Sequence, residues 1–311
     1  MKKIYFLLLM LPTLLVMGAC TKDDDNSGTI PVEQLNVNAN STSIPYATGL
    51  EVPHLDSNNQ FLARTTTYNG KKVLTYVMEY NKEKKHSKWV AFTFQADTRA
   101  INWKRANWDS TEWGGDPFQA DPDIAAGERT ELEDYYYEYP YVRGHLLASY
   151  DRVYSKDANE QTFYLSNISP MLSSFNSGDY SMWNEMEGNV QSWGRNSTFC
   201  DTLFVVKGGT IRDGEIATGD VNYLPLQKNG LTVPKYYFAA VLCKKMTETG
   251  ATYKAIGFWF PHKPSLTGKL ADYVIPVSEL EVKTGIDFFC NLPDALEESV
   301  EENVMLSGWG M

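Results

Sequence analysis

Apolar residues along this chain occur mainly in short runs rich in Val, Tyr, Phe and Ile, separated by polar and turn-forming residues. Such runs are typical of β-strands, because branched and aromatic side chains suit a pleated, partly buried surface. The runs predict strands at 72–79, 89–94, 202–207, 236–244, 252–260 and 272–276. Turn signals fall at Asn69-Gly70, Gly208-Gly209 and Asn229-Gly230. The pattern indicates a mainly antiparallel sheet.

A different spacing predicts two helices. Apolar residues recur three or four positions apart from about Ser181 onward, and again from about Pro293. The first set is Trp183, Met186, Val190 and Trp193, and the second is Leu296, Val300 and Val304. No repeat of fixed period and no long low-complexity segment interrupts residues 45–311. We therefore expect one domain over residues 45–311, of the α+β class, with a mainly antiparallel central sheet flanked by helices.

The amino terminus has the features of an export signal. Lys2 and Lys3 precede an apolar run, 4–17, which ends in small residues before Cys20. This is typical of a signal peptide, and the run is short for a membrane-spanning helix. A cysteine directly after small residues suits bacterial lipoprotein processing, although Met17 stands where leucine is usual. We expect removal of residues 1–19 and lipidation of Cys20, the alternative being ordinary secretion with Cys20 as a plain thiol.

The segment 20–44 differs in composition from the rest of the chain. It is acidic at 23–25 and otherwise rich in Asn, Ser, Thr and Gly, a composition that cannot bury a core and predicts a flexible tether. Together with the leader, it suggests a protein exported from the cytoplasm. We expect a lipid anchor, as its only membrane contact, to hold it at the outer membrane or cell surface of a Gram-negative bacterium. A soluble periplasmic or secreted protein is the alternative.

The chain is acidic, with 28 Lys and Arg against 39 Asp and Glu and a formal net charge of −11. Loss of residues 1–19, which contain two lysines and no acidic residue, brings the charge to −13. This argues against a broad basic surface for nucleic acid, because affinity for phosphates comes largely from Lys and Arg. It remains compatible with a local basic cleft.

Three cysteines, Cys200, Cys243 and Cys290, follow Cys20. An odd number allows at most one disulfide among them, and an oxidising compartment makes one plausible. Sequence does not fix the connectivity, and of the possible pairs we favour Cys200 with Cys290.

The most informative block runs from Tyr141 to Trp193. It contains in turn Arg143-Gly144-His145, Leu165-Ser166-Asn167-Ile168-Ser169-Pro170, Asn176 and Trp183-Asn184-Glu185-Met186-Glu187. In order and type these separated elements resemble the DNA/RNA non-specific endonucleases of the ββα-metal class. Weaker landmarks at 50–53, 99–103, 121–122, 233–236 and 284–289 extend the resemblance over about residues 45–295. The resemblance implies a ββα-metal active site and hydrolysis of DNA and RNA without strong sequence preference.

Phosphodiester hydrolysis needs a base for the attacking water, positive charge near the phosphoryl oxygens and stabilisation of the departing oxygen. Imidazole can accept a proton near neutral pH, and the resemblance makes His145 the general base. It also implies that Arg143 and Arg99 contact phosphate, which a planar guanidinium suits. Asn167 matches a second active-site amide, which orients the base or the substrate. We expect the other histidines to be structural: His54, His86 and His262.

A hard divalent cation such as Mg²⁺ prefers oxygen ligands and keeps several waters. The resemblance implies Mg²⁺, or Mn²⁺ or another divalent cation, with Asn176 as the direct protein ligand and Glu187 bound through water. Glu185 points about 160° away from Glu187 on a helix of ~3.6 residues per turn, so only one of them can face the site. We assign Glu187.

The block also departs from the family pattern. Val142 replaces a usual Asp, a common proline is absent from 146–149, and the loop Ser177–Met182 is long enough to move Glu187 relative to Asn176. Two other functions stay open: a degenerate surface lipoprotein that binds polyanions, and a phosphodiesterase for small nucleotides. Retention of His145 and Asn176 argues against the first. The acidic net charge slightly favours the second.

Overall fold

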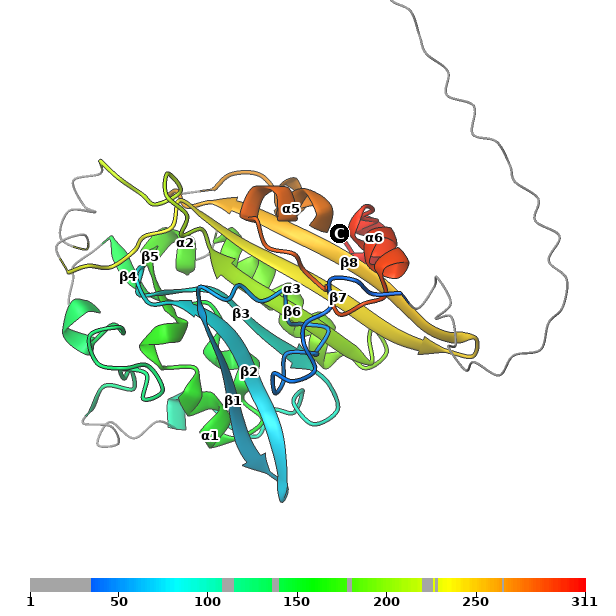
Figure 1. The fold of residues 1–311 in the computed structure, drawn as a ribbon, viewed down its shortest axis with the longest axis horizontal. Coiled ribbons are helices and arrows are strands. Elements are labelled where there is room, and N and C mark those ends of the chain that lie inside the picture. Colours follow the sequence, from blue (N-terminus) through cyan, green and yellow to red (C-terminus); the bar gives the residue numbers. More distant parts are fainter. Residues whose placement is uncertain are drawn as a thin grey trace, which may run out of the picture. The chain divides into compact units, whose positions relative to one another are not determined.

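A seven-stranded antiparallel sheet forms the centre of the domain (Figure 1). The computed structural model describes residues 35–107, 115–135, 140–177, 181–219, 226, 229–264 and 266–311. The strand order in this sheet is β1-β2-β3-β6-β7-β8-β9, and every neighbouring pair is antiparallel. The strands are β1 (Gln60–Tyr68), β2 (Lys71–Asn81), β3 (His86–Phe94), β6 (Thr202–Gly209), β7 (Tyr236–Thr247), β8 (Gly250–Pro261) and β9 (Val274–Ile275). The expected α+β class with an antiparallel central sheet is confirmed.

Five of these strands, β2, β3, β6, β7 and β8, contain the runs that the apolar pattern predicts. The turn signal Asn69-Gly70 joins β1 to β2, and both residues have positive φ, 51° and 74°. A two-residue hairpin loop with two positive φ values matches the twist of the paired strands. The hairpin explains how the polar edge strand β1 is held in register.

The structure differs from the predicted strands and turns in three places. The segment that forms β1 was not expected to be a strand, because this edge strand carries the polar run Arg64-Thr65-Thr66-Thr67. Gly208-Gly209 is not a turn but lies within β6, where a Cβ on Gly208 would overlap the Phe238 ring. The run 272–276 contributes only Val274–Ile275 as a strand, after a short 3₁₀ helix.

Both faces of the sheet are covered. Side chains alternate along each strand, so Leu203 and Val205 of β6 pack in one hydrophobic cluster and Phe204 and Val206 in the other. Helix α3 (Met182–Arg195) belongs to the first cluster. Helices α5 (Val277–Thr284) and α6 (Asp294–Glu301) belong to the second, and Figure 1 shows them along β8. The sheet therefore separates two layers, and only one contains α3.

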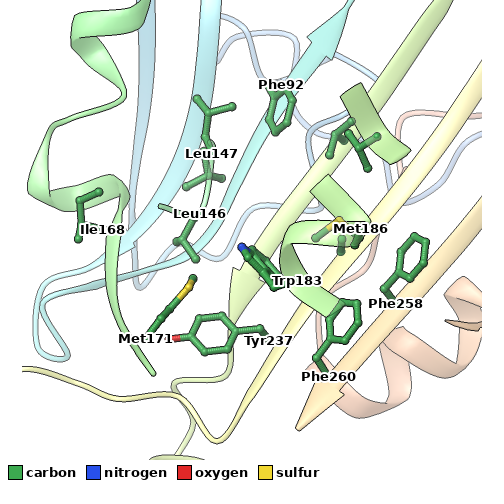
Figure 2. Close-up of a cluster of buried hydrophobic side chains, with 14 of the residues drawn as sticks. Phe92, Leu146, Leu147, Ile168, Met171, Trp183, Met186, Tyr237, Phe258 and Phe260 are labelled. Atoms are coloured by element: carbon green, nitrogen blue, oxygen red, sulfur yellow. The ribbon is translucent and has the colours of Figure 1, made fainter. Parts of the chain in front are cut away.

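The α3 layer also holds a two-stranded antiparallel ribbon, β4 (Tyr141–His145) with β5 (Ile168–Leu172). Figure 2 shows Trp183 of α3 facing Tyr237 and Phe260 of the sheet, with ring centroids 5.6 and 6.0 Å away. Short helices complete this layer and the connections: α1 (Lys156–Gln161), α2 (Ser173–Asn176) and 3₁₀ helices at Arg105–Asn107, Leu132–Tyr135, Ser149–Arg152, Leu165–Asn167, Leu270–Tyr273 and Leu306–Trp309. No helix among the described residues is long and apolar enough to cross a membrane.

The two expected helices form. Ser181 caps α3 by accepting a hydrogen bond from the Asn184 amide, which satisfies a free N–H of the first turn. Helix α6 ends at Glu301, so the expectation that it runs through Val304 is wrong. The chain has to leave α6 because Trp309 packs on Trp193, 4.7 Å between ring centroids, on the other side of the sheet.

The three described cysteines are free, and the favoured Cys200–Cys290 pairing is wrong. Cys200 lies in the α3 layer and donates a hydrogen bond to the Trp193 carbonyl. The Cys290 thiol contacts the Val52 carbonyl, next to residues of the opposite layer. A disulfide needs Cα atoms about 4.4 to 6.8 Å apart, which residues on opposite faces of one sheet do not provide.

The domain begins before the expected boundary at residue 45. Asn36 donates hydrogen bonds to the carbonyls of Cys290 and Leu292, and Asn38 donates to Asp287 and Glu297. Residues 35–40 are thus bonded to the carboxy-terminal part of the domain and are not a tether. The expected signal peptide, Cys20 and the rest of the expected tether lie outside the described residues.

Asn38 bonds Glu297, one of three neighbouring carboxyl groups whose pKa values are raised by burial. Glu297 and Glu301 are 6% and 5% exposed, and burial raises the pKa of Glu297 to about 8 and that of Glu301 to about 10. Burial likewise raises the pKa of the neighbouring Glu281 to about 7. Since these pKa values lie above the unfolded value of about 4.5, the folded state binds more protons above that pH. Stability should therefore fall as pH rises from about 4.5 through the folded pKa values.

Glu301→Gln should remove the largest part of this pH dependence. At pH 8 we expect the free energy of unfolding to rise by about 2 kcal/mol, because an amide has no proton to lose on unfolding. At pH 4.5 we expect almost no change. Urea unfolding at both pH values measures the difference, with the exposed Glu302→Gln as the control. An equal effect of Glu301→Gln at the two pH values would contradict the prediction.

Candidate active site

A cavity of about 400 Å³ opens in the α3 layer. It brings together residues that are far apart in the chain, from β4, α2, α3 and two 3₁₀ helices. Its lining residues are Arg105, His145, Ala148, Ser149, Tyr150, Val153, Asn176, Ser177, Asn184, Glu187 and Gln191. Three of the residues singled out from the sequence, His145, Asn176 and Glu187, therefore face one space.

His145 is the last residue of β4, and its ring is held by aromatic neighbours. The ring centroids of Phe118 and Phe163 lie 5.5 and 5.1 Å from that of the imidazole. Its Nε2 atom is buried and has no hydrogen-bond partner among the described residues. Burial, followed by the charges of Arg105, Lys207 and Arg143, lowers the pKa of His145 well below its ordinary 6.5. The imidazole is therefore neutral at neutral pH, with a nitrogen free to accept a proton.

Gly144 and Met171 pack together next to His145. Gly144 pairs with Ser169 across the ribbon, and a Cβ at Gly144 would lie within 2.4 Å of the Met171 sulfur. The glycine thus allows the Met171 side chain to pack against the backbone next to His145.

Asn167 holds the chain immediately after His145. Its fully buried amide accepts a hydrogen bond from the Leu147 amide at 2.9 Å and donates to the carbonyls of Leu147 and Thr162 at 3.0 and 2.7 Å. All of its polar atoms are thereby used within the protein, and it does not line the cavity. The geometry leaves Asn167 able to position the segment that carries His145, but not to contact a substrate.

The arginines are placed differently from one another. Arg143 is paired with Asp116, 2.8 Å between Nη1 and Oδ2, and its guanidinium lies over the Phe118 ring. Its charge acts on His145 although it does not line the cavity. Arg99 is not brought to the site, because its guanidinium donates to the Asp201 carbonyl beside β6. The arginine that does line the cavity is Arg105.

Arg105 was not identified from the sequence. It lies just after the 99–103 landmark, within the basic pair Lys104-Arg105, and its guanidinium lies 5.1 Å from the centroid of the Phe163 ring. That ring also packs on His145. The 99–103 landmark therefore pointed to the right region of the chain. Its spacing alone could not show whether Arg99 or Arg105 faces the cavity.

Asn176 and Glu187 supply oxygen atoms to the cavity. Within the described residues, no protein group bonds the Asn176 amide. Glu187 lies on α3 one turn after Trp183, whereas Glu185 is exposed and does not line the cavity. Part of the loop Ser177–Met182, whose length raised doubt about this arrangement, lies outside the described residues.

A buried lysine holds Glu187 from behind. Lys207 of β6 is fully buried, and its Nζ lies 3.1 Å from an oxygen of Glu187 and 3.1 Å from an oxygen of Asp151. Asp151 also accepts hydrogen bonds from the Gln191 side chain and the Ala148 amide. Although burial alone would lower it, the two carboxylates raise the pKa of Lys207 above its ordinary value.

Burial raises the pKa of Glu187 to about 7, against the opposing effect of Lys207. Sequence reasoning missed both Lys207 and Asp151, which are 56 residues apart. The only local signal was a lysine inside an otherwise apolar strand, since parity places Lys207 on the α3 face with Leu203 and Val205. Among the described residues, no group of three or more His, Cys, Asp or Glu side chains is arranged to hold a metal ion.

A family model for DNA/RNA non-specific endonucleases matches residues 57–295. The chain belongs to the DNA/RNA non-specific endonuclease family. The matched segment contains β1 to β9 and all the residues of the cavity. As a family member, the chain is an endonuclease that acts on phosphodiester bonds.

Curated relatives agree with this assignment. The chain is similar to a nuclease of Nostoc sp., with 27% identity over 236 residues, 74% of this chain and 76% of the relative. It is 26% identical to nuclease C1 of Cunninghamella echinulata over 70% of this chain and 81% of the relative. Human mitochondrial endonuclease G is 26% identical over 56% of this chain and 57% of the relative.

The fold has a counterpart among solved structures. A chain from the crystal structure of the EndoG/EndoGI complex superimposes with a TM-score of 0.54. The match covers 74% of the present chain and 87% of the solved chain, with 20% sequence identity. At this identity the likeness supports the EndoG-like fold and nothing more specific.

Proposed function

We propose that this endonuclease hydrolyses DNA and RNA without strong sequence preference, with His145 as the general base and one divalent cation held at Asn176. The observation that carries the proposal is the convergence of His145, Asn176 and Glu187 on one cavity. His145 combines a neutral imidazole with an unpartnered, buried Nε2. These are the properties of a proton acceptor ready to act on water.

The residues present fit a hard divalent cation. The Asn176 amide oxygen and the Glu187 carboxylate are the hard oxygen donors that Mg²⁺ or Mn²⁺ prefers, and both line the cavity. Asn176 would hold the cation directly, and Glu187 would hold it through water. When bound, the cation would neutralise charge on the phosphoryl oxygens and stabilise the leaving oxygen.

The chain's own groups would do the rest. His145 Nε2 would take a proton from the attacking water, and the aromatic rings around the imidazole would keep that atom directed at the cavity. Arg105 supplies positive charge at the cavity, and Arg143 adds charge nearby. Because a guanidinium can contact two phosphate oxygens at once, Arg105 replaces Arg99 as the arginine that we assign to the phosphate.

The direct test is incubation of the purified chain with circular double-stranded DNA and with RNA, in Mg²⁺, in Mn²⁺ and in EDTA. We expect both polymers to be cleaved in either metal and neither in EDTA, with Asn176→Ala needing a higher metal concentration for the same rate. Asn189→Ala, a substitution on the outer part of α3, serves as a matched control. Cleavage that persists in EDTA would overturn the role of the cation.

The alternatives predict other results. A degenerate polyanion-binding protein would retard both polymers in a gel without cutting them, in every metal. A phosphodiesterase for small nucleotides would hydrolyse small diesters and leave both polymers intact. A polyanion-binding protein would need neither a base nor a metal ligand, whereas His145 and Asn176 line one cavity here.

We also propose that the protein is exported and anchored by a lipid on Cys20. The support is the order of basic, apolar and small residues over 1–20. Cys20→Ser should move the protein from the membrane fraction to the soluble fraction of fractionated cells. Equal membrane association of both forms would refute lipid anchoring.

A further inference from the structure

A second hollow continues from the active-site cavity along α3. It has a volume of about 460 Å³ and shares two lining residues with the cavity, Tyr150 and Gln191. The others are Gly188, Ser192, Arg195 and Asn196. None of its described lining residues is a carboxylate, although the chain as a whole carries a net charge of −11.

The groove follows one face of the helix. Glu187, Gln191 and Arg195 are four residues apart, a spacing that places side chains on one side of an α-helix. At ~1.5 Å per residue, about 12 Å separates the levels of Glu187 and Arg195. With ~3.4 Å of rise per nucleotide in one strand, this length spans about three nucleotides.

Arg195 is a fixed cation at the far end of the groove. Its guanidinium lies 4.4 Å from the centroid of the Tyr150 ring and 5.2 Å from that of Phe94, and it donates to the Tyr150 carbonyl. No described carboxylate forms an ion pair with it, and its Nε is buried without a partner. By contrast, the half-exposed Arg212 is paired with Glu215. A positive charge that is held in place and forms no ion pair with a described carboxylate suits a phosphate.

Tyr150 and Gly188 line the groove between its ends. Tyr150 is 49% exposed, although one face of its ring carries the Arg195 guanidinium. Gly188 lies in the interior of α3, where glycine costs ~1 kcal/mol relative to alanine. A Cβ there would meet no atom within 4 Å, so packing does not require glycine. Its absence of a side chain keeps the groove open.

We propose that this groove binds the strand adjacent to the cleaved bond, with Arg195 on a phosphate and Tyr150 stacked on a base. The inference rests on the proposed function, and it makes a nucleic-acid polymer, not a small diester, the preferred substrate. Base stacking on an aromatic ring is largely independent of sequence. Phosphate contacts carry no sequence information either, so the groove adds affinity without adding specificity.

The test compares two substrates, a single-stranded oligonucleotide of about 12 nucleotides and the small diester bis(p-nitrophenyl) phosphate. We expect Arg195→Gln to lower kcat/KM for the oligonucleotide about tenfold, mainly through KM, and for the small diester less than twofold. Tyr150→Ala should lower the oligonucleotide value about fivefold, within the range for loss of one stacked base. Gly188→Gln, which fills the groove without removing a contact, should act in the same direction.

Arg212→Gln is the matched control, because it removes an arginine from a cavity that shares no lining residue with the groove. Thermal unfolding of each variant checks folding, and Arg195→Lys should recover part of the oligonucleotide activity because it restores the charge. An equal loss for both substrates in Arg195→Gln and Gly188→Gln would overturn the groove.

Failure of the proposed function gives a different result. If the chain with its native residues hydrolyses neither substrate, binding of the labelled oligonucleotide is measured by fluorescence anisotropy instead. Weaker binding in Arg195→Gln but not in Arg212→Gln would then support the groove alone. Equal binding by both variants would reject it.

Discussion

Replacement of His145 by alanine is expected to lower kcat/KM on plasmid DNA and on RNA about a thousandfold, within the range for loss of a general base. The physical reason is that His145 carries the one imidazole among the described residues that line the cavity, and its Nε2 has no hydrogen-bond partner among the described residues. Because the pKa of His145 is held well below 6.5, its proton-accepting form is already present at neutral pH. Initial rates at saturating Mg²⁺, measured on both polymers, give the effect.

The matched control is His54→Ala. His54 bonds the Asn38 carbonyl in the layer opposite α3 and does not line the cavity, so its loss should leave the rates unchanged. Thermal unfolding of His145→Ala should show a modest change only, since the Phe118 and Phe163 rings can close on the vacated space. Retention of more than about a tenth of the activity would show that another group acts as the base.

The second large effect is expected at Lys207. Lys207→Met leaves the carboxylates of Asp151 and Glu187 buried without their shared cation. Breaking a buried ion pair by removal of one partner typically costs about 3 to 5 kcal/mol, and we expect about 3 kcal/mol of stability to be lost at pH 8. Since Glu187 also faces the cavity, kcat/KM should fall about a hundredfold.

The pH dependence identifies the cause. Without Lys207, the two carboxyl groups should take up protons more readily when folded, so the loss of stability should grow as pH rises above about 4.5. Urea unfolding at pH 5 and pH 8 measures this, and Asp151→Asn in the Lys207→Met background should restore part of the stability at pH 8. The control Lys245→Met removes a partly exposed lysine of β7 and should change stability by less than about 0.5 kcal/mol. An equal loss at both pH values would indicate a packing defect.

The sequence was sufficient for the parts of the site that are local. Arg143 and His145 are two positions apart on one strand, and Glu187 follows Trp183 by one helical turn, so their neighbourhood could be read from spacing. Glu185 and Glu187 could be told apart by the helical repeat alone. The longest apolar strands were predicted for the same reason, because their period is set by the backbone.

The remaining features depend on tertiary contacts that no local pattern encodes. The Lys207–Asp151 pair joins a strand to a 3₁₀ helix across 56 residues. Asn167 matched an active-site amide in position, yet three backbone contacts occupy its side chain. Arg105 lines the cavity whereas Arg99, six residues earlier, donates to the Asp201 carbonyl. Cys200 and Cys290 were paired on number alone, without knowledge that the sheet lies between them.

The attachment of residues 36–40 to the carboxy-terminal segment has a consequence for how the enzyme meets its substrate. Asn40 bonds the Cys290 thiol and the backbone of 52–53, in the layer that contains α5 and α6. The cavity lined by His145, Asn176 and Glu187 opens on the other side of the sheet, beside α3. Leu35, the first described residue, accepts a hydrogen bond from the Asp294 amide at the start of α6 and so lies on the side of the sheet away from the cavity. A chain held at a surface through its amino terminus would turn its working side toward the surroundings, where a long polymer can approach without passing the point of attachment.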